Sequence, residues 1–225
     1  MKKKYRLLSY PINSDTPIYG NGRPLVVDRE RSIEKGDSCN LFYVSFNNHF
    51  GTHVDAPKHF SEGGRSITDY EISELIFDAP ALVECEKAAD ELIMPDDIIK
   101  HESRVKSADI LLLRTGFYKI RGQKVYSLHN PGVSPETFKY LRENCPNLRA
   151  IMIDTISVSA FQRREDGRKA HFEALSAKEG HGQPLLLVED ADLSGDFGGL
   201  SQVMVVPLFL KGVDSMPCTV IGIFY

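Results

Sequence analysis

The stretch NNHFGTHVDAPKHF, residues 47–60, gathers three of the seven histidines of the chain and one aspartate. Gly51 and Pro57 disfavour a helix here, so the pattern predicts an extended segment that runs into a turn. Side chains alternate between the two sides of an extended chain. The odd-numbered polar residues therefore share one face: His49, His53, Asp55 and His59.

This set of side chains predicts a divalent metal site. Imidazole nitrogens and carboxylate oxygens suit zinc or manganese, and three protein ligands with an open position are what a catalytic ion requires. The alternative is a structural polar cluster without a metal, but burying such groups without a partner is costly. We therefore expect the rest of the chain to be organised around a bound ion.

The composition indicates a chain with a substantial hydrophobic core. Its 225 residues are 42% hydrophobic, which suits one large domain or at most two small ones, and we expect one domain over residues 1–225. A net charge of −4 and a pI near 6.0 argue against nucleic acid or an anionic membrane as a partner. No stretch is long enough to span a bilayer.

The cysteines and the first residues bear on localisation. The four cysteines lie far apart in the sequence, so they form neither a metal knuckle nor a small disulfide framework. The basic residues 1–6 are followed by only two leucines before a polar stretch, so the apolar core of a signal peptide is missing. A reducing, cytoplasmic setting is expected.

Apolar runs alternate with helix-starting segments along the chain. The run ILLL at 110–113 predicts a strand buried on both faces, and Ser134-Pro135-Glu136 predicts the start of a helix. A second buried strand follows at 148–153, and this strand–helix–strand rhythm indicates the α/β class. Further strands are expected at 41–46, 79–85, 185–188, 203–210 and 219–224, short helices at 94–99 and 171–178, and loops at 15–22, 163–168 and 212–217. Strand 41–46 leads into His49. We therefore expect this strand to belong to the sheet, and the segment that carries the ligands to follow directly from the end of that sheet.

The motif HFGTHVDAPKHF at 49–60 resembles the signature of the "Putative cyclase" family of metal-dependent hydrolases, which includes bacterial kynurenine formamidase and isatin hydrolase. Other short motifs follow the family's order over nearly the whole chain: GD at 36–37, LLRTG at 112–116, IDTIS at 153–157, the lone His171, LVED at 187–190 and PL at 207–208. The resemblance implies a mixed β-sheet with flanking helices in a swivelling β/β/α arrangement. It also implies a homodimer or higher homo-oligomer, and one or two divalent ions in each site.

The resemblance also implies roles for individual residues. His59 would be the catalytic acid/base, and Asp55 could bridge two ions. The implied metal ligands are His49, His53, Asp55, His171 and Glu189.

The last two of these ligands have rivals. Glu189 follows His171 by 18 residues, more than in compact family members, and Asp190 stands where the family usually has asparagine. An insertion around residues 178–183 would explain both differences. The rival ligands are Glu173, Glu179 and His181.

The residue expected to contact the substrate ring differs from the family pattern. Kynurenine formamidases carry a tryptophan in the N-terminal loop against the substrate ring, but this chain has no tryptophan. Tyr19 stands nearest that place and is the expected substrate-binding wall, with N-formylkynurenine expected to be a weak substrate. Phe50 and Phe60 point away from the ligands by parity, so we expect them in the core.

The expected function is hydrolysis of the carbon–nitrogen bond in a small amide or lactam by a metal-dependent enzyme. A bound ion lowers the pKa of its water from about 15.7 to roughly 7, so hydroxide is available as the nucleophile, and His59 delivers the proton to the leaving nitrogen. Asp154 could orient a ligand histidine or cap a turn, and we expect the turn. Two alternatives are a metal-assisted cyclase or dehydratase and a metal-binding protein without turnover; His59 argues against the second.

Overall fold

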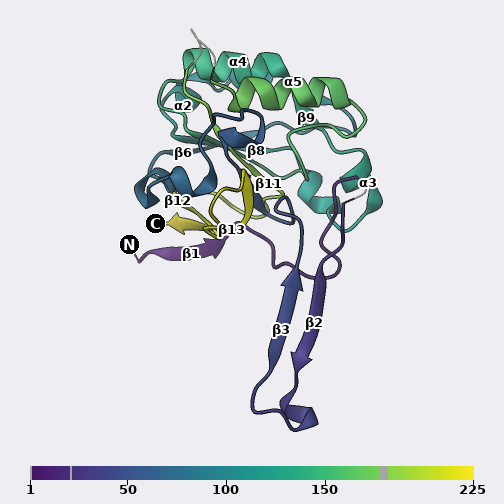
Figure 1. The fold of residues 1–225 in the computed structure, drawn as a ribbon. Helices are drawn as coiled ribbons and strands as arrows, with labels where there is room; N and C mark the ends of the chain where they lie inside the picture. The colour runs from purple at the N-terminus through teal and green to yellow at the C-terminus, as the bar shows by residue number, and fades with distance from the viewer. Residues whose placement is uncertain (1, 21, 178–181) are drawn as a thin grey trace.

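A mixed β-sheet forms the centre of the computed structural model, which describes residues 2–20, 22–177 and 182–225 (Figure 1). The sheet strands within these ranges are β1 (Lys4–Leu7), β4 (His53–Asp55), β5 (Ile76–Phe77), β6 (Pro80–Glu84), β8 (Ile110–Arg114), β10 (Ala150–Ile153), β11 (Leu186–Glu189), β12 (Leu200–Pro207) and β13 (Ser215–Phe224). Their order is β5-β12-β13-β4-β11-β10-β8-β6, and β1 also pairs with β13. The neighbours β6, β8, β10 and β11 are parallel, whereas the pairs made by β4, β12 and β13 are antiparallel.

Three of the parallel strands, β8, β10 and β11, are buried on both faces, as their continuous apolar sequences predict. In β8, Leu111 and Leu113 pack in one core cluster, and Ile110 and Leu112 pack in the other. This division follows from the two-residue period of a strand. The central strands are therefore held from both sides and give the site a rigid base.

Helices cover one face of the sheet. α4 (Pro135–Asn144) and α5 (Arg164–Leu175) lie side by side above it (Figure 1). The hydroxyl of Ser134 accepts a hydrogen bond from the Thr137 amide, which confirms the predicted start of α4. The shorter helices are α1 (Pro95–Ile99), α2 (Glu102–Lys106) and α3 (Lys124–Leu128), and the 3-10 turns are η1 (Ile33–Lys35), η2 (Pro57–His59), η3 (Ile67–Asp69), η4 (Ile72–Leu75) and η5 (Phe117–Ile120).

The predicted loop at 163–168 is wrong, because α5 already begins at Arg164. Glu165 and Asp166 lie in its first turn, where negative charge is favourable. Arg163 pairs with Asp166 at 2.8 Å, and Lys169 pairs with Glu165 at 2.9 Å. The charged residues therefore lie on the solvent-exposed side of the first turns of α5.

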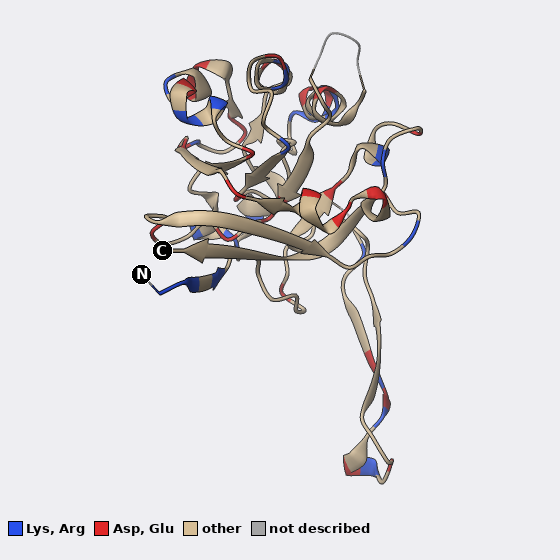
Figure 2. Cartoon of the chain, turned by 90° about the vertical axis from the view of Figure 1, so that its left-hand side faces the viewer, with Lys and Arg blue, Asp and Glu red and all other residues tan. Residues whose placement is uncertain are grey.

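Two strands stand apart from the main sheet. β2 (Val26–Arg31) and β3 (Leu41–Ser45) pair with each other and extend away from the other elements (Figures 1 and 2). The prediction that strand 41–46 shares a sheet with the ligand segment is wrong, because its alternating pattern indicates a strand but does not specify its partner. β7 (Leu92–Ile93) and β9 (Gly132–Val133) form another small parallel pair.

The predicted class, an α/β fold with a mixed sheet and flanking helices, is confirmed. The loop expected at 212–217 is shorter than predicted, because β13 begins at Ser215. No helix in the described ranges has the length and apolar character needed to cross a bilayer.

Candidate metal centre

Neighbouring strands bring three of the predicted ligands together. His53 and Asp55 lie on β4, and β11 pairs with β4 so that Glu189 is opposite His53. His53 and Asp55 share one face of β4, whereas Val54 packs in the core on the other face. The sheet register itself therefore assembles this part of the site.

Turns, and not an extended chain, bring in the other two histidines of the motif. Gly51 has φ of +63°, a left-handed conformation that favours glycine, and the chain turns there before β4 begins. η2 turns the chain again and places His59 beside the site. The predicted extended segment is therefore limited to β4 and is wrong before it, whereas the predicted turn follows at η2; His49 and His59 still reach the same pocket.

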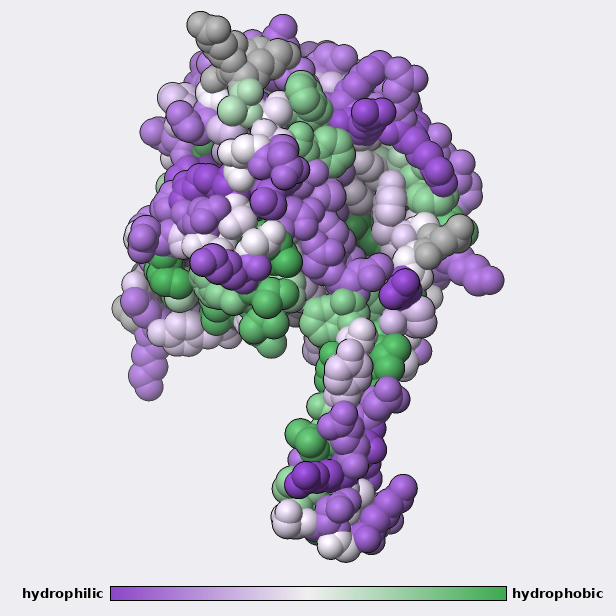
Figure 3. Space-filling model, viewed as in Figure 1, coloured by the Kyte–Doolittle hydropathy of each residue, from purple (hydrophilic) through white to green (hydrophobic). Residues whose placement is uncertain are grey.

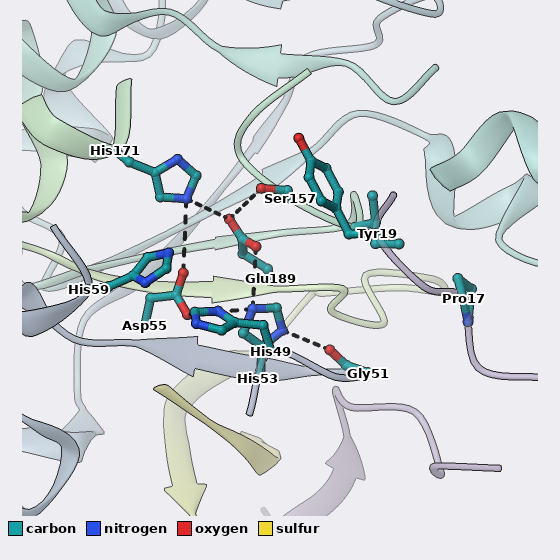
Figure 4. A pocket seen from close by; sticks show the side chains of 11 residues that line it. Pro17, Tyr19, His49, Gly51, His53, Asp55, His59, Ser157, His171 and Glu189 are labelled. Atoms are coloured by element: carbon teal, nitrogen blue, oxygen red, sulfur yellow. Dashed lines mark hydrogen bonds and ion pairs between the residues drawn. The ribbon is translucent and has the colours of Figure 1, made fainter. Parts of the chain in front are cut away.

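The ligand atoms converge on Asp55 (Figure 4). Asp55 Oδ1 lies 2.9 Å from His49 Nδ1 and 3.5 Å from His53 Nε2, and its Oδ2 lies 3.9 Å from His171 Nε2. Glu189 lies 3.4 Å from His53 Nε2 through Oε2 and 3.5 Å from His171 Nε2 through Oε1. The residues that the sequence predicts as ligands thus form one cluster.

Two groups in this cluster have ligand atoms that all lie within 4.8 Å of one another. One contains His49, Asp55 and His59, and the other contains His53, Asp55 and Glu189. Asp55 belongs to both groups. The geometry therefore suits either one ion or two ions that share this carboxylate.

Backbone and hydroxyl partners fix the orientation of two imidazoles. His53 Nδ1 donates to the Gly51 carbonyl at 2.9 Å, and His171 Nδ1 lies 3.0 Å from the Gly167 carbonyl and 2.9 Å from Ser159 Oγ. Each ring then presents Nε2 to the carboxylates. This is how metal-binding histidines are usually held.

Two hydrogen bonds from the protein also position the Glu189 carboxylate. Its Oε1 accepts hydrogen bonds from Ser157 Oγ at 3.0 Å and from the Val158 amide at 2.8 Å. Both donors come from the loop that follows β10. The carboxylate is therefore positioned independently of any ion.

Three buried atoms at the centre have no hydrogen-bond partner among the described residues: His53 Nε2, Asp55 Oδ1 and Asp55 Oδ2. The 2.9 Å approach of His49 to Asp55 is an ion-pair distance without hydrogen-bond geometry. Uncompensated buried polar atoms are costly. Their directions and chemistry fit a divalent cation with nitrogen and oxygen ligands.

The electrostatics of the site favour a cation. Burial lowers the pKa of His49, but the Asp55 and Asp214 carboxylates outweigh it and raise the pKa to about 10. Burial raises the pKa of Glu189, but His171 and His53 outweigh it and lower the pKa to about 2. The buried carboxylates thus remain negatively charged and demand positive charge nearby.

Sequence reasoning missed Asp214, which lies in the predicted loop just before β13. Its Oδ2 accepts from His59 Nδ1 at 2.7 Å and lies 3.3 Å from His49 Nε2. Its Oδ1 accepts from the Asn48 side-chain amide at 2.7 Å. A single aspartate 155 positions after His59 carries no local sequence signal that connects the two residues.

The cluster opens into a pocket of about 280 Å³ that Tyr19 lines (Figure 4). The Tyr19 ring packs edge-on against Phe161, with ring centroids 5.3 Å apart. Phe50 is buried, as predicted. Phe60, which parity placed away from the ligands, instead stacks on His171 at 4.9 Å because η2 changes the direction of the chain.

Glu173, one of the rival ligands, and Asp154 lie outside the cluster. Glu179 and His181 fall outside the described residues, and Glu173 lines a separate groove beside α5. Asp154 accepts hydrogen bonds from the Thr115 amide at 2.8 Å and the Gly116 amide at 2.9 Å. It therefore caps the loop after β8, as expected.

Similar sequences and folds are known. The family model described as "Putative cyclase" matches residues 7–160. The chain is 25% identical over 212 residues to the kynurenine formamidase of Bacillus cytotoxicus, which covers 93% of this chain and 92% of that protein. It is 32% identical over 114 residues to an uncharacterized protein of Haemophilus influenzae, which covers 50% of this chain and 80% of that one.

Two solved structures have the same fold. Isatin hydrolase A from Labrenzia aggregata, solved with benzyl benzoate bound, aligns with a TM-score of 0.77 at 18% identity, covering 99% of this chain and 94% of that one. A predicted metal-dependent hydrolase from Bacillus stearothermophilus aligns with a TM-score of 0.76 at 21% identity, covering 99% of each chain.

Proposed function

The chain belongs to the "Putative cyclase" family, as its motifs predict, and we propose that it is a metal-dependent hydrolase of the carbon–nitrogen bond in a small amide or lactam. One observation carries this proposal. His53 and Asp55 present buried atoms that have no hydrogen-bond partner in the described part of the chain, next to Glu189, at the base of an open pocket. The known activities of the kynurenine formamidase and isatin hydrolase relatives support the same reaction class.

We assign the ion, or the pair of ions, to the predicted ligands. A bound divalent ion lowers the pKa of a water from about 15.7 to roughly 7 and polarises a carbonyl oxygen. Zinc fits the mixture of imidazole and carboxylate, and manganese is the alternative. The proposed ligands are His49, His53, Asp55, His171 and Glu189.

His59 is proposed as the general acid/base. Its Nδ1 donates to Asp214, so its Nε2 is available to exchange a proton with the substrate in the pocket. Such a group contributes about 10²–10⁴ in rate. Asp214 fixes the orientation of the ring, and this pair argues against a metal-binding protein without turnover.

The pocket supports a small, flat substrate. A volume of about 280 Å³ leaves room for one ring and its reacting group. Tyr19 is proposed as the aromatic wall, and burial raises its pKa to about 12, so its hydroxyl remains neutral and able to donate. A ring with a polar group at that edge should bind best, and N-formylkynurenine should be a weak substrate.

The remaining proposals concern the setting of the enzyme. The four cysteines are free, which suits a reducing cytoplasm. We propose a homo-oligomer, with the homodimer as its simplest form.

The test combines metal analysis with an activity panel. Elemental analysis should find about one or two equivalents of zinc or manganese per chain. An isatin, an aryl formamide and N-formylkynurenine should then be assayed before and after chelation, and turnover of at least one should fall on chelation and return with the ion. A metal-free protein that shows no affinity in titration would disprove the proposal.

A further inference from the structure

Asp190 directly follows the proposed ligand Glu189, and its carboxylate is buried. Few charged side chains in the described part of the chain are buried, and the surface over α4 and α5 is mainly hydrophilic (Figure 3). Asp190, in contrast, is only 1% exposed. Burying a carboxylate is costly unless it is paired and hydrogen-bonded. Its partners therefore indicate what this residue does.

Two side chains hold the Asp190 carboxylate through three hydrogen bonds. Arg121 donates from Nε to Oδ1 at 2.7 Å and from Nη2 to Oδ2 at 2.5 Å, and the Tyr126 hydroxyl donates to Oδ1 at 2.6 Å. Arg121 also lies over the Tyr10 ring, 4.0 Å from its centroid. Arg121 directly follows η5, and Tyr126 lies on α3. This group of Arg121, Tyr126 and Asp190, which we call the anchor cluster, therefore ties the end of β11 to the segment around α3.

The backbone of Asp190 makes a turn that the anchor cluster holds in place. Its φ is +53°, a left-handed conformation that is uncommon for residues other than glycine. Its amide donates to the Thr155 carbonyl at 2.7 Å, and its carbonyl accepts from Thr52 Oγ1 at 2.6 Å. Thr155 belongs to the loop after β10, and Thr52 directly precedes His53. The turn therefore connects the end of β11 to the start of β4.

This turn lies next to two of the proposed ligands. Glu189 precedes Asp190 in the chain, and the sheet register places His53 opposite Glu189. A change in the Asp190 backbone would break the contact with Thr52 and rotate the Glu189 carboxylate away from its donors. A metal site requires its ligands to be held within about 0.5 Å of the productive geometry.

We propose that Arg121 and Tyr126, acting through Asp190, are positioning residues that set how Glu189 and His53 face one another and thereby the affinity of the site for its ion. The anchor cluster does not line the pocket, so it acts on the ion only through the backbone of these ligands. The inference rests on the proposed function, because it takes Glu189 and His53 as metal ligands. Residues that orient metal ligands in this way change metal affinity by about 10–100-fold when they are replaced.

A double-mutant cycle tests the coupling. Arg121→Met and Asp190→Asn each leave one charge of the buried pair unmatched, so each should raise the dissociation constant for Zn²⁺ by about 10–100-fold, measured in competition with a chelator. The double variant has neither charge, asparagine tolerates the left-handed conformation, and Tyr126 can still donate to it. It should therefore bind Zn²⁺ more tightly than either single variant. A double variant that binds no more tightly than either single one, or single variants with wild-type affinity, would overturn the proposal.

Arg149→Met is the matched control for a general loss of stability. Arg149 also forms an ion pair, with Asp109 at 3.1 Å, and donates to the carbonyls of Glu74 and Ile76, but it does not line the metal pocket. This variant should unfold at a lower urea concentration and keep wild-type affinity for Zn²⁺. A loss of Zn²⁺ affinity as large as that of Arg121→Met would contradict a specific positioning role.

Crystal structures of the metal-free wild type and metal-free Arg121→Met separate this inference from the proposed function. In the variant, the Thr52 hydroxyl should lose the Asp190 carbonyl, and the Glu189 carboxylate should leave the Val158 amide. If both contacts are unchanged, the positioning role is wrong, whether or not the chain binds a metal. A wild type without affinity for Zn²⁺ or Mn²⁺ would instead disprove the proposed function, and the two crystal structures would still decide the positioning role.

Discussion

His53 and His59 are held differently, and this difference supports the separate roles proposed for them, metal binding for His53 and proton transfer for His59. His53 is buried, and its Nε2 faces two carboxylates. The side chain of His59 is 26% exposed, and its Nδ1 is bound by Asp214. We expect His53→Ala to lose the metal. His59→Ala should retain the metal and lose about 10²–10⁴ of kcat.

Metal content and kcat measured on the same preparations check this expectation. His129→Ala is the control, because His129 is an exposed histidine that pairs with Asp90 and does not line the pocket; it should change neither quantity. If His59→Ala sheds the metal as readily as His53→Ala, then His59 is a ligand and not the acid/base.

The sequence predicts single residues well where they lie in one motif. The alternation of His53 and Asp55 has a direct structural cause, because both lie on β4. That Glu189 belongs to the site could be predicted, because it ends an apolar strand, which is a rigid place for a ligand. That Asp214 belongs to the site could not be predicted, because only the pairing of β13 with β4 brings it to His59.

The contact between α5 and the loop after β10 determines where His171 lies. A Cβ atom at Gly167 would lie 2.3 Å from Ser159 Oγ and 2.5 Å from Ser159 Cβ, so Gly167→Ala must push the helix and the loop apart. Ser159 and the Gly167 carbonyl both contact His171, and the same loop holds Glu189. Gly167→Ala should therefore lower both stability and metal affinity, with stability falling by about 1–3 kcal/mol.

Urea unfolding and metal titration measure the two effects. Gly63→Ala is the matched control, because nothing lies within 4 Å of its added Cβ, and it should leave both values nearly unchanged. Full metal affinity in Gly167→Ala would show that the helix position does not govern the site.

At the level of elements, composition misled the prediction in two places. The charged start of α5 resembles a solvated loop, although its acidic residues favour a helix N-terminus. β3 has the alternating pattern of a sheet strand, yet its apolar face meets no core in the described part of the chain. In both cases the local pattern was sound, and the missing information was which surface the element contacts.

For the whole molecule, the sheet joins distant parts of the chain at the site. β4 lies between β11 and β13, so the ligand strand is held on one side by Glu189 and on the other by the strand that follows Asp214. The class of the fold was predictable from the buried strands and the helix between them. The antiparallel half was not, because its pairing depends on contacts distant in sequence.

Because the proposed ligands come from three separate segments, a bound ion should stabilise the whole fold. β4, α5 and β11 each supply proposed ligands, and unfolding would separate them. An ion present at about 100 times its dissociation constant adds about 2.7 kcal/mol to the stability of the folded state. For a chain of this size, removing it should lower Tm by about 5–10 °C. Differential scanning calorimetry with and without a chelator measures the shift. Asp55→Ala, which lacks the shared carboxylate, should show no response to the chelator. An equal Tm for the wild type under both conditions would mean that the cluster holds no ion that contributes to folding.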